Sequence, residues 1–102
     1  MPVYCVRLLP PRPSFPADIT PQEGEAMQRH VGYWSSLAQA GHALLFGPVA
    51  DPKGSWGLGV IEAEDEAALR GMLGQDPVIL AALGFQHEVL PMPRGVITRA
   101  GL

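Results

Sequence analysis

The sequence predicts an α+β fold with the element order β-α-β-β-α-β. Three observations favour this class: four short apolar runs typical of strands, two longer segments with helix-capping signals, and a Pro-Gly turn that joins the second strand to the third. A chain of 102 residues has the length of one domain. We therefore expect residues 1–102 to form a single domain.

The first strand is expected at residues 3–9, an apolar run (VYCVRLL) that ends where the prolines begin. Residues 10–20 contain four prolines in the run PPRPSFPADIT. So many prolines exclude regular structure, and this segment is predicted to be an ordered loop or flap.

A long helix follows this loop. In the motif TPQE, Thr20 is the N-cap, Pro21 takes the first helical position, and Glu23 completes a capping box. The helical pattern runs to about Ala40, and Gly41 is a candidate left-handed C-cap.

The rest of the chain continues with strands, turns and short helices. In chain order we expect a strand at 42–49, a hairpin turn at 51–54, a strand at 55–63, a helix at 66–74 capped by Asp65, a short helix from Pro77 capped by Asp76, a strand from 85, and an irregular tail at 91–102. This order is the split βαβ, or ferredoxin-like, plan with an antiparallel sheet.

Both faces of the predicted sheet are apolar. In the first strand Tyr4, Val6 and Leu8 alternate with Val3, Cys5, Arg7 and Leu9, and in the second Leu44 and Phe46 alternate with Ala43, Leu45 and Val49. Two helices cover only one face, and a face left in water would carry polar residues. With 47% hydrophobic and 17% charged residues, the chain is expected to form a homodimer, in which two sheets close into a barrel.

Composition also bears on partners and location. The net charge is −3 and the seven Lys and Arg residues are scattered, so we expect no nucleic-acid binding. Residues 31–50 lack formal charge, but their periodicity changes midway, so we expect no membrane span. The start of the chain does not resemble a signal peptide, and Cys5, the single cysteine, cannot form an intrachain disulfide; a cytoplasmic location is expected.

No motif for nucleotide phosphates, metal ligation or an activated nucleophile is present. His30, His42 and His87 lack the spacing of metal ligands, so we expect no metal, although a site assembled in space stays open. His42 opens a strand and His87 lies in the last strand beside Glu88, and both are interpreted as structural.

His30 is the first candidate for chemistry. On a helical wheel Met27, Val31, Trp34 and Ala38 define the buried stripe, and His30 lies about 60° from its centre. An imidazole at this edge can contact both the interior and a cleft, as proton transfer requires. The alternative is a boundary histidine that packs against Trp34.

Asp76 has a structural reading and a functional one. An aspartate before Pro77 is an expected N-cap, which stabilises a helix by roughly 0.5–2 kcal/mol. The two readings are compatible, because one carboxylate oxygen can accept from a backbone N–H while the other orients an imidazole.

Five further side chains are candidates for ligand contact. Arg7 lies in the apolar row of the uncovered sheet face, where it pairs either with a carboxylate or with a substrate anion. Arg12, in the proline loop, either closes on a ligand or is solvated. Trp34, Phe46 and Trp56 belong either to the core and interface or to the apolar walls of a pocket.

Three segments, HVGYWSSLAQAG at 30–41, GPVADPKGSWG at 47–57, and the later DP with GFQHEVLPM, resemble the YCII-related (YciI-like) family. The resemblance covers nearly the whole chain and implies a dimeric α+β barrel of ferredoxin-like protomers. It also implies that His30 and Asp76 form a functional pair. The family is proposed to include small enzymes without cofactors, and relatives with this fold include muconolactone isomerases and dehydrochlorinases.

The leading hypothesis is a cofactor-independent lyase or isomerase. Asp76 would fix the tautomer of His30, and His30 would move a proton on a small anionic or enolisable molecule, in a pocket covered by residues 10–20. One alternative is a non-catalytic small-ligand binder or accessory subunit. Another is a structural dimer in which the His–Asp contact only joins two helices.

Overall fold

The computed structural model describes residues 1–94, and residues 95–102 lie outside this description. Its elements are, in chain order, β1 (Val3–Leu9), α1 (Pro21–Gln39), β2 (Ala43–Val49), β3 (Trp56–Glu62), α2 (Glu66–Gly74), α3 (Pro77–Leu80) and β4 (Gln86–Met92). The strands form one antiparallel sheet in the order β2-β3-β1-β4. The predicted α+β, ferredoxin-like fold is therefore confirmed.

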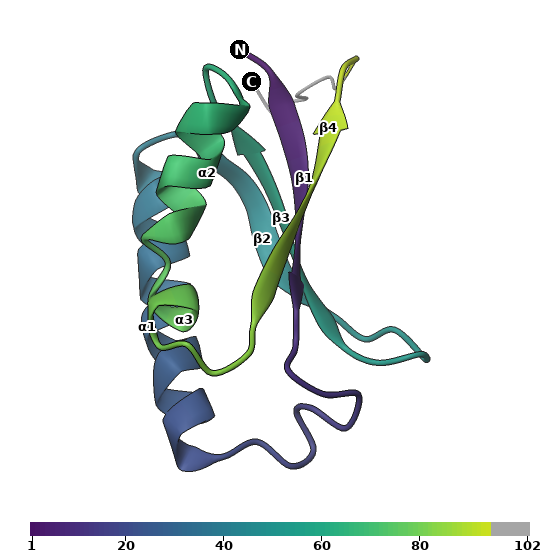
Figure 1. The fold of residues 1–102 in the computed structure, drawn as a ribbon. Coiled ribbons are helices and arrows are strands. Elements are labelled where there is room, and N and C mark those ends of the chain that lie inside the picture. Colours follow the sequence, from purple (N-terminus) through teal and green to yellow (C-terminus); the bar gives the residue numbers. More distant parts are fainter. Residues whose placement is uncertain (95–102) are drawn as a thin grey trace.

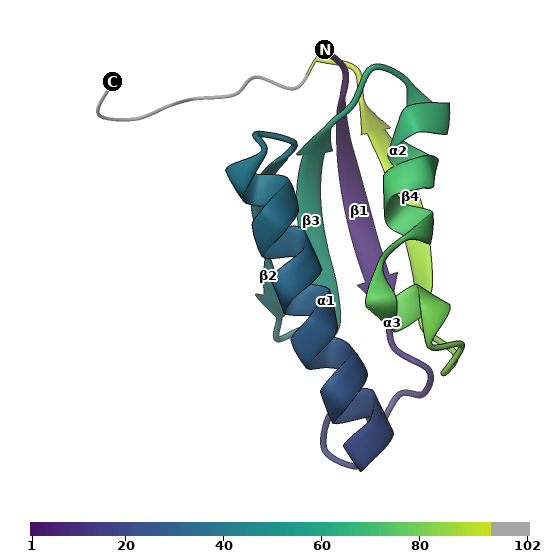
Figure 2. The ribbon, with the colours of Figure 1, turned by 90° about the vertical axis from the view of Figure 1, so that its left-hand side faces the viewer.

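All three helices lie on the same face of the sheet (Figures 1 and 2). The opposite face, here called the free face, has no helix over it in the described part of the chain. No helix among residues 1–94 has both the length and the apolar character needed to cross a bilayer.

The capping signals place α1 as predicted. The Thr20 side chain accepts a hydrogen bond from the Glu23 amide, and the Glu23 carboxylate accepts one from the Thr20 amide at 2.9 Å, which completes the capping box. At the other end Ala40 is the C-cap, and Gly41 follows with a φ of 86°. That left-handed conformation favours glycine, because a Cβ atom would clash there with the backbone.

An irregularity in β2 corrects one prediction. Ala43 pairs with Ile61, but Leu45 pairs with Val60, so the register shifts between them. A bulge of this kind reverses the alternation of the side chains. Ala43 and Leu45 were predicted to share a face, which is wrong: Ala43 is 5% exposed in the core, whereas Leu45 is 55% exposed.

Two clusters of buried side chains fill the space between the helices and the sheet. The larger includes Trp34 of α1, and the smaller joins Leu8 and Phe85 to Val78 of α3. Among the described residues, the buried polar or charged ones are Glu23, His30 and Asp76. Buried polar groups need partners, and the contacts of these three define the candidate site and one of its walls.

The free face carries exposed apolar side chains. Leu45, Val60, Cys5 and Leu90 form one row across the four strands, since each is paired with the next. Leu45 is 55% exposed and Leu90 is 47% exposed. The strand β4 continues to Met92. The irregular tail was predicted to begin at residue 91, which is wrong for residues 91 and 92, because both belong to β4. Residues 95–102 of the predicted tail lie outside the described part of the chain.

Candidate functional site

His30 and Asp76 are in direct contact. His30 lies on α1 and Asp76 is the N-cap of α3, and the packing of these helices brings Nδ1 of the imidazole to 2.7 Å from Oδ2 of the carboxylate. The side chain of His30 is 11% exposed and that of Asp76 is fully buried. The two residues that the sequence singled out are therefore brought together.

The two oxygen atoms of Asp76 have different partners. Oδ1 accepts a hydrogen bond from the backbone amide of Val78 at 3.1 Å, which caps α3. Oδ2 accepts from Trp34 Nε1 at 2.8 Å in addition to its contact with His30. The carboxylate thus caps a helix with one oxygen and orients an imidazole with the other.

The charge of Asp76 follows from these contacts. Burial raises the pKa of its carboxyl, but the hydrogen bonds from His30 and Trp34 and the nearby imidazole of His87 outweigh burial and hold the pKa well below its usual range. Asp76 is therefore an anion near neutral pH. Because an ionised carboxylate only accepts hydrogen bonds, the hydrogen lies on Nδ1 of His30, and Nε2 is the nitrogen left for other partners.

A second histidine lies against the same carboxylate oxygen. Nε2 of His87 is 3.5 Å from Oδ2 of Asp76, too long for a hydrogen bond, and this atom is buried without a hydrogen-bond partner. The sequence interpretation treated His87 as structural and missed this placement. Strand alternation offered a signal, since His87 pairs with Leu8, and Leu8 faces the core.

A cavity of about 550 Å³ adjoins this cluster. Both His30 and His87 line it, together with the three aromatic residues predicted as apolar walls, Trp34, Phe46 and Trp56. The proline loop also contributes to the wall, through Pro10, Phe15, Pro16 and Ile19.

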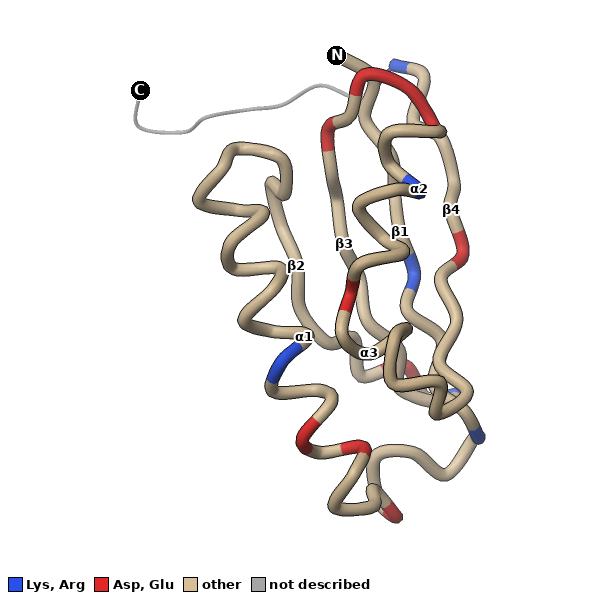
Figure 3. The backbone as a smooth tube through the Cα atoms, turned by 60° about the vertical axis from the view of Figure 1, so that its left-hand side comes forward, with Lys and Arg blue, Asp and Glu red and all other residues tan. Residues whose placement is uncertain are grey.

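The described residues give the cavity wall no permanently charged side chain. Of the described residues that line it, none is a lysine, arginine, aspartate or glutamate. Figure 3 shows lysine and arginine dispersed along the described chain. Arg7 and Arg12, the predicted counter-ions, are not part of the wall.

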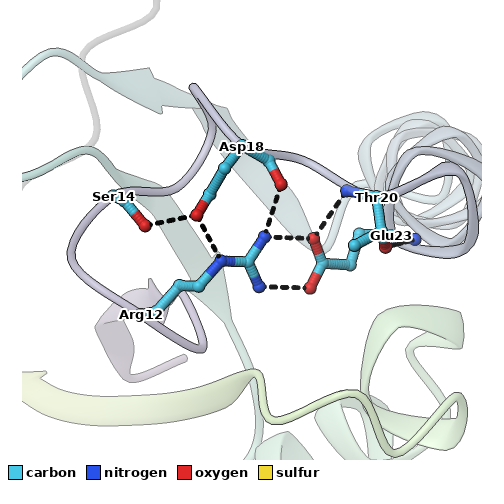
Figure 4. A network of polar contacts seen from close by, with 5 residues as sticks. All are labelled: Arg12, Ser14, Asp18, Thr20 and Glu23. Carbon is cyan, nitrogen blue, oxygen red and sulfur yellow. Dashed lines mark hydrogen bonds and ion pairs between the residues drawn. The ribbon is translucent and has the colours of Figure 1, made fainter.

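Arg12 instead ties the proline loop to the start of α1 (Figure 4). Its guanidinium donates to both carboxylate oxygens of Glu23, each at 2.7 Å, and to the side chain and backbone of Asp18 at 2.9 and 2.8 Å. These bonds to Arg12, with the amide of Thr20, lower the pKa of Glu23 to about 2. The proline loop is an ordered segment with defined partners, as predicted.

Arg7 has partners within its own chain. Its Nη1 donates to Oε1 of Glu88 on the neighbouring strand at 3.1 Å, and its guanidinium carbon lies 4.4 Å from the centre of the Trp56 ring. Its Nε is buried without an acceptor in the described chain. Trp56 also lines the cavity, so it connects the cavity wall to the free face.

The arrangement suits proton transfer better than metal binding. Among residues 1–94, no group of three or more histidine, cysteine, aspartate or glutamate side chains is placed to hold a metal ion. An imidazole oriented by a buried carboxylate at the wall of a cavity can accept and return a proton.

The sequence model of the YCII-related domain matches residues 4–93. The chain belongs to the YCII-related family. The matched region of this YCII-related chain runs from β1 to just beyond β4 and includes His30, Asp76 and His87. A search of curated proteins finds no match.

Proposed function

We propose that this YCII-related protein is a small cofactor-independent enzyme of the lyase or isomerase type, which uses His30 and Asp76 for acid–base chemistry. The observation that carries the proposal is the 2.7 Å contact between Nδ1 of His30 and Oδ2 of Asp76, with the same imidazole at the wall of a cavity of about 550 Å³. Cavities of this size suit small molecules.

The proton transfer would proceed in two steps. Nε2 of His30 takes a proton from a carbon next to a carbonyl group of the substrate, and the carbonyl oxygen takes up the electron pair as an enolate. The imidazolium formed is stabilised by the buried carboxylate of Asp76. The proton then returns to another substrate atom in an isomerisation, or a leaving group departs in an elimination.

Trp34 supports this chemistry by holding the carboxylate. Its indole donates to Oδ2 of Asp76 at 2.8 Å, and only 2% of the residue is exposed. A carboxylate held by a buried indole and a helix cap keeps the imidazole in one orientation, which is the preorganisation that proton transfer needs.

One observation favours a second function, that of a non-catalytic small-ligand binder. Asp76 caps α3 and bonds Trp34, so its place in this fold has a structural purpose independent of catalysis. In that case the cavity would hold a ligand without converting it.

The test is hydrogen exchange on enolisable probes. The protein is incubated in D2O with a set of small ketones and lactones, and loss of the proton signals next to the carbonyl is followed by NMR. We expect His30→Gln to slow this exchange by about 10²- to 10⁴-fold with little change in melting temperature. His42→Gln serves as the matched control, because His42 does not line the cavity, and it should keep the wild-type rate.

The alternatives give different results. Unchanged exchange in His30→Gln would contradict the enzyme proposal. A large fall in melting temperature with ligand binding preserved would favour the structural reading, and a ligand that binds without exchange would favour the binder.

We also propose that the protein works as a homodimer joined through the free face, in a reducing compartment such as the cytoplasm. The exposed row that contains Leu45 and Leu90 supports this assembly, as does the dimeric barrel implied by the family resemblance. The pair of Arg7 and Glu88 lies in the next row. If the two-fold axis passes near this row, Arg7 of each chain can face Glu88 of the other.

A further inference from the structure

His87 has a side chain that is only 7% exposed, and the proposed chemistry does not use it. Its Nε2 is buried without a hydrogen-bond partner, 3.5 Å from Oδ2 of Asp76. That oxygen already accepts from His30 and Trp34, so its two lone pairs are occupied. Unpaired buried polar groups are costly and rare in native proteins, and they call for a reason.

The orientation of His87 assigns its hydrogen. A nitrogen lone pair directed at an anionic oxygen would be repelled, so Nε2 carries the hydrogen and faces Asp76. The acceptor nitrogen of the neutral ring is then Nδ1. His30 is arranged in the opposite sense, with its hydrogen on Nδ1 and Nε2 left over. Two imidazoles at one carboxylate therefore each keep one acceptor nitrogen for a ligand.

The rest of the wall is apolar. Side chains from strands, helix and loop contribute to it, including Val6, Leu8, Phe15, Met27, Phe46 and Phe85. No lysine or arginine among the described residues lines the cavity. A ligand with several charges would lose its water here without gaining a counter-ion, which is strongly unfavourable.

We propose that the cavity takes a molecule with an apolar, ring-sized body and a single polar end that carries a hydroxyl group, and that Nδ1 of His87 accepts a hydrogen bond from this hydroxyl. The inference rests on the proposed function, because it takes the cavity to be the substrate site. It names the substrate class and makes His87 a positioning residue, which accepts a hydrogen bond from the hydroxyl of the polar end while His30 transfers the proton of a neighbouring carbon. Because neither Arg7 nor Arg12 lines the cavity, this class replaces the anionic substrate that those two residues suggested in the sequence.

Three probes built on a single benzene ring test the class. These are p-cresol, with one hydroxyl; toluene, with the same body and no polar group; and isophthalate, with two carboxylates. Binding to the full-length protein is measured by NMR titration, with the imidazole nitrogen signals of both histidines followed. We expect p-cresol to bind about three- to tenfold more tightly than toluene and to shift the signals of both His30 and His87. Isophthalate should show no measurable binding.

Variants of His87 test its part. In His87→Leu the preference for p-cresol over toluene should be lost, whereas toluene itself should bind about as well as before. His87→Gln keeps a polar group and should retain part of the preference. His42→Leu is the control and should leave the ratio unchanged. A purely structural role for His87 would lower both affinities together and leave their ratio intact.

Several results would overturn the inference. They are equal binding of p-cresol and toluene, a response from His30 alone, tighter binding of isophthalate, or no binding of any probe at millimolar concentration. If His87→Leu does not fold, the titration of the wild-type protein still decides. These readouts need no turnover, so failure here with exchange abolished in His30→Gln would leave the proposed function standing. If the probes bind as expected but His30→Gln exchanges as fast as the wild type, the proposed catalysis is contradicted and the proposed ligand class stands.

Discussion

Asp76 performs two tasks through its two oxygen atoms. Oδ1 caps α3, and Oδ2 accepts from Trp34 and His30. Because the side chain is fully buried, neither oxygen is exposed to bulk solvent. Replacing the carboxylate therefore changes the stability of the fold and the orientation of the imidazole at the same time.

We predict that Asp76→Asn lowers the free energy of unfolding by about 2–4 kcal/mol near neutral pH. The new amide can still accept from Val78, but its NH2 group would face the donors of Trp34 and His30. Urea unfolding at several pH values measures the effect. Because the folded-state pKa of Asp76 is lowered, its contribution is fully present above the ordinary value of 3.8 and is lost as the pH falls below it. The gap between the wild type and Asp76→Asn should therefore narrow in acid.

Asp65→Asn is the matched control, because Asp65 caps α2 through Ala68 at an exposed position. Asparagine caps a helix about as well as aspartate, so this variant should be nearly as stable as the wild type. Equal effects of the two substitutions would show that capping alone explains Asp76.

Single residues of the site were predictable to different degrees. His30 and Asp76 were found because helix periodicity and a capping signal marked them and the family resemblance paired them. His87 was missed, because a histidine beside a glutamate in a terminal strand gives no local sign of its partner. Only the folding of the chain brings its Nε2 close to Asp76. Arg12 was found as a loop residue, but its bonds to Glu23 and Asp18 depend on a loop path that the prolines do not specify.

At the scale of elements, β3 is shaped to receive a helix side chain. A Cβ atom at Gly59 would come within about 2.5 Å of the Trp34 ring, closer than real contacts allow. Glycine at this position therefore lets the indole of α1 lie against the strand and reach Asp76.

We predict that Gly59→Ala lowers the free energy of unfolding by about 1–3 kcal/mol, because the buried ring must move to admit the methyl group. The indole should also lose its bond to Asp76, which near-ultraviolet circular dichroism and the indole N–H signal of Trp34 would report. Gly47→Ala on β2 is the control, since nothing lies within 4 Å of the point where its Cβ atom would stand. Similar behaviour of the two variants would contradict this account of the packing.

The helices and strands themselves were largely predictable. A capping box with a proline places α1, and an N-cap aspartate with a proline places α3, each within a residue of its observed start, because these signals act locally. The bulge between Ala43 and Leu45 was not predictable. It depends on how β2 pairs with β3, and both residues are apolar in the sequence.

At the scale of the whole molecule, the helices cover one face of the sheet (Figure 2). The free face keeps an apolar row that includes the exposed Leu45 and Leu90. Apolar alternation on both faces of the strands indicated this from the sequence. What covers the free face depends on a second chain, so a single sequence indicates the need for a partner better than it indicates the geometry of the contact.

We predict that Leu45→Glu and Leu90→Glu each shift the protein from dimer to monomer. In a two-fold interface both chains would bury the new carboxylate in apolar surroundings, which disfavours association. Sedimentation velocity at micromolar concentration measures the change. Leu80→Glu is the control: Leu80 is 62% exposed and lies on α3, on the helix side of the sheet. A monomeric wild type, or dimers in both free-face variants, would refute the proposed interface.

The bonds of Arg12 have a consequence for how the molecule assembles. They join residues no more than 11 positions apart, and the same Glu23 that they engage also completes the cap of α1. Contacts so close in sequence cost little loop-closure entropy. One boundary of the ligand enclosure can therefore take shape early, from a short stretch of chain, before the far strands that carry His87 and Trp56 are in place.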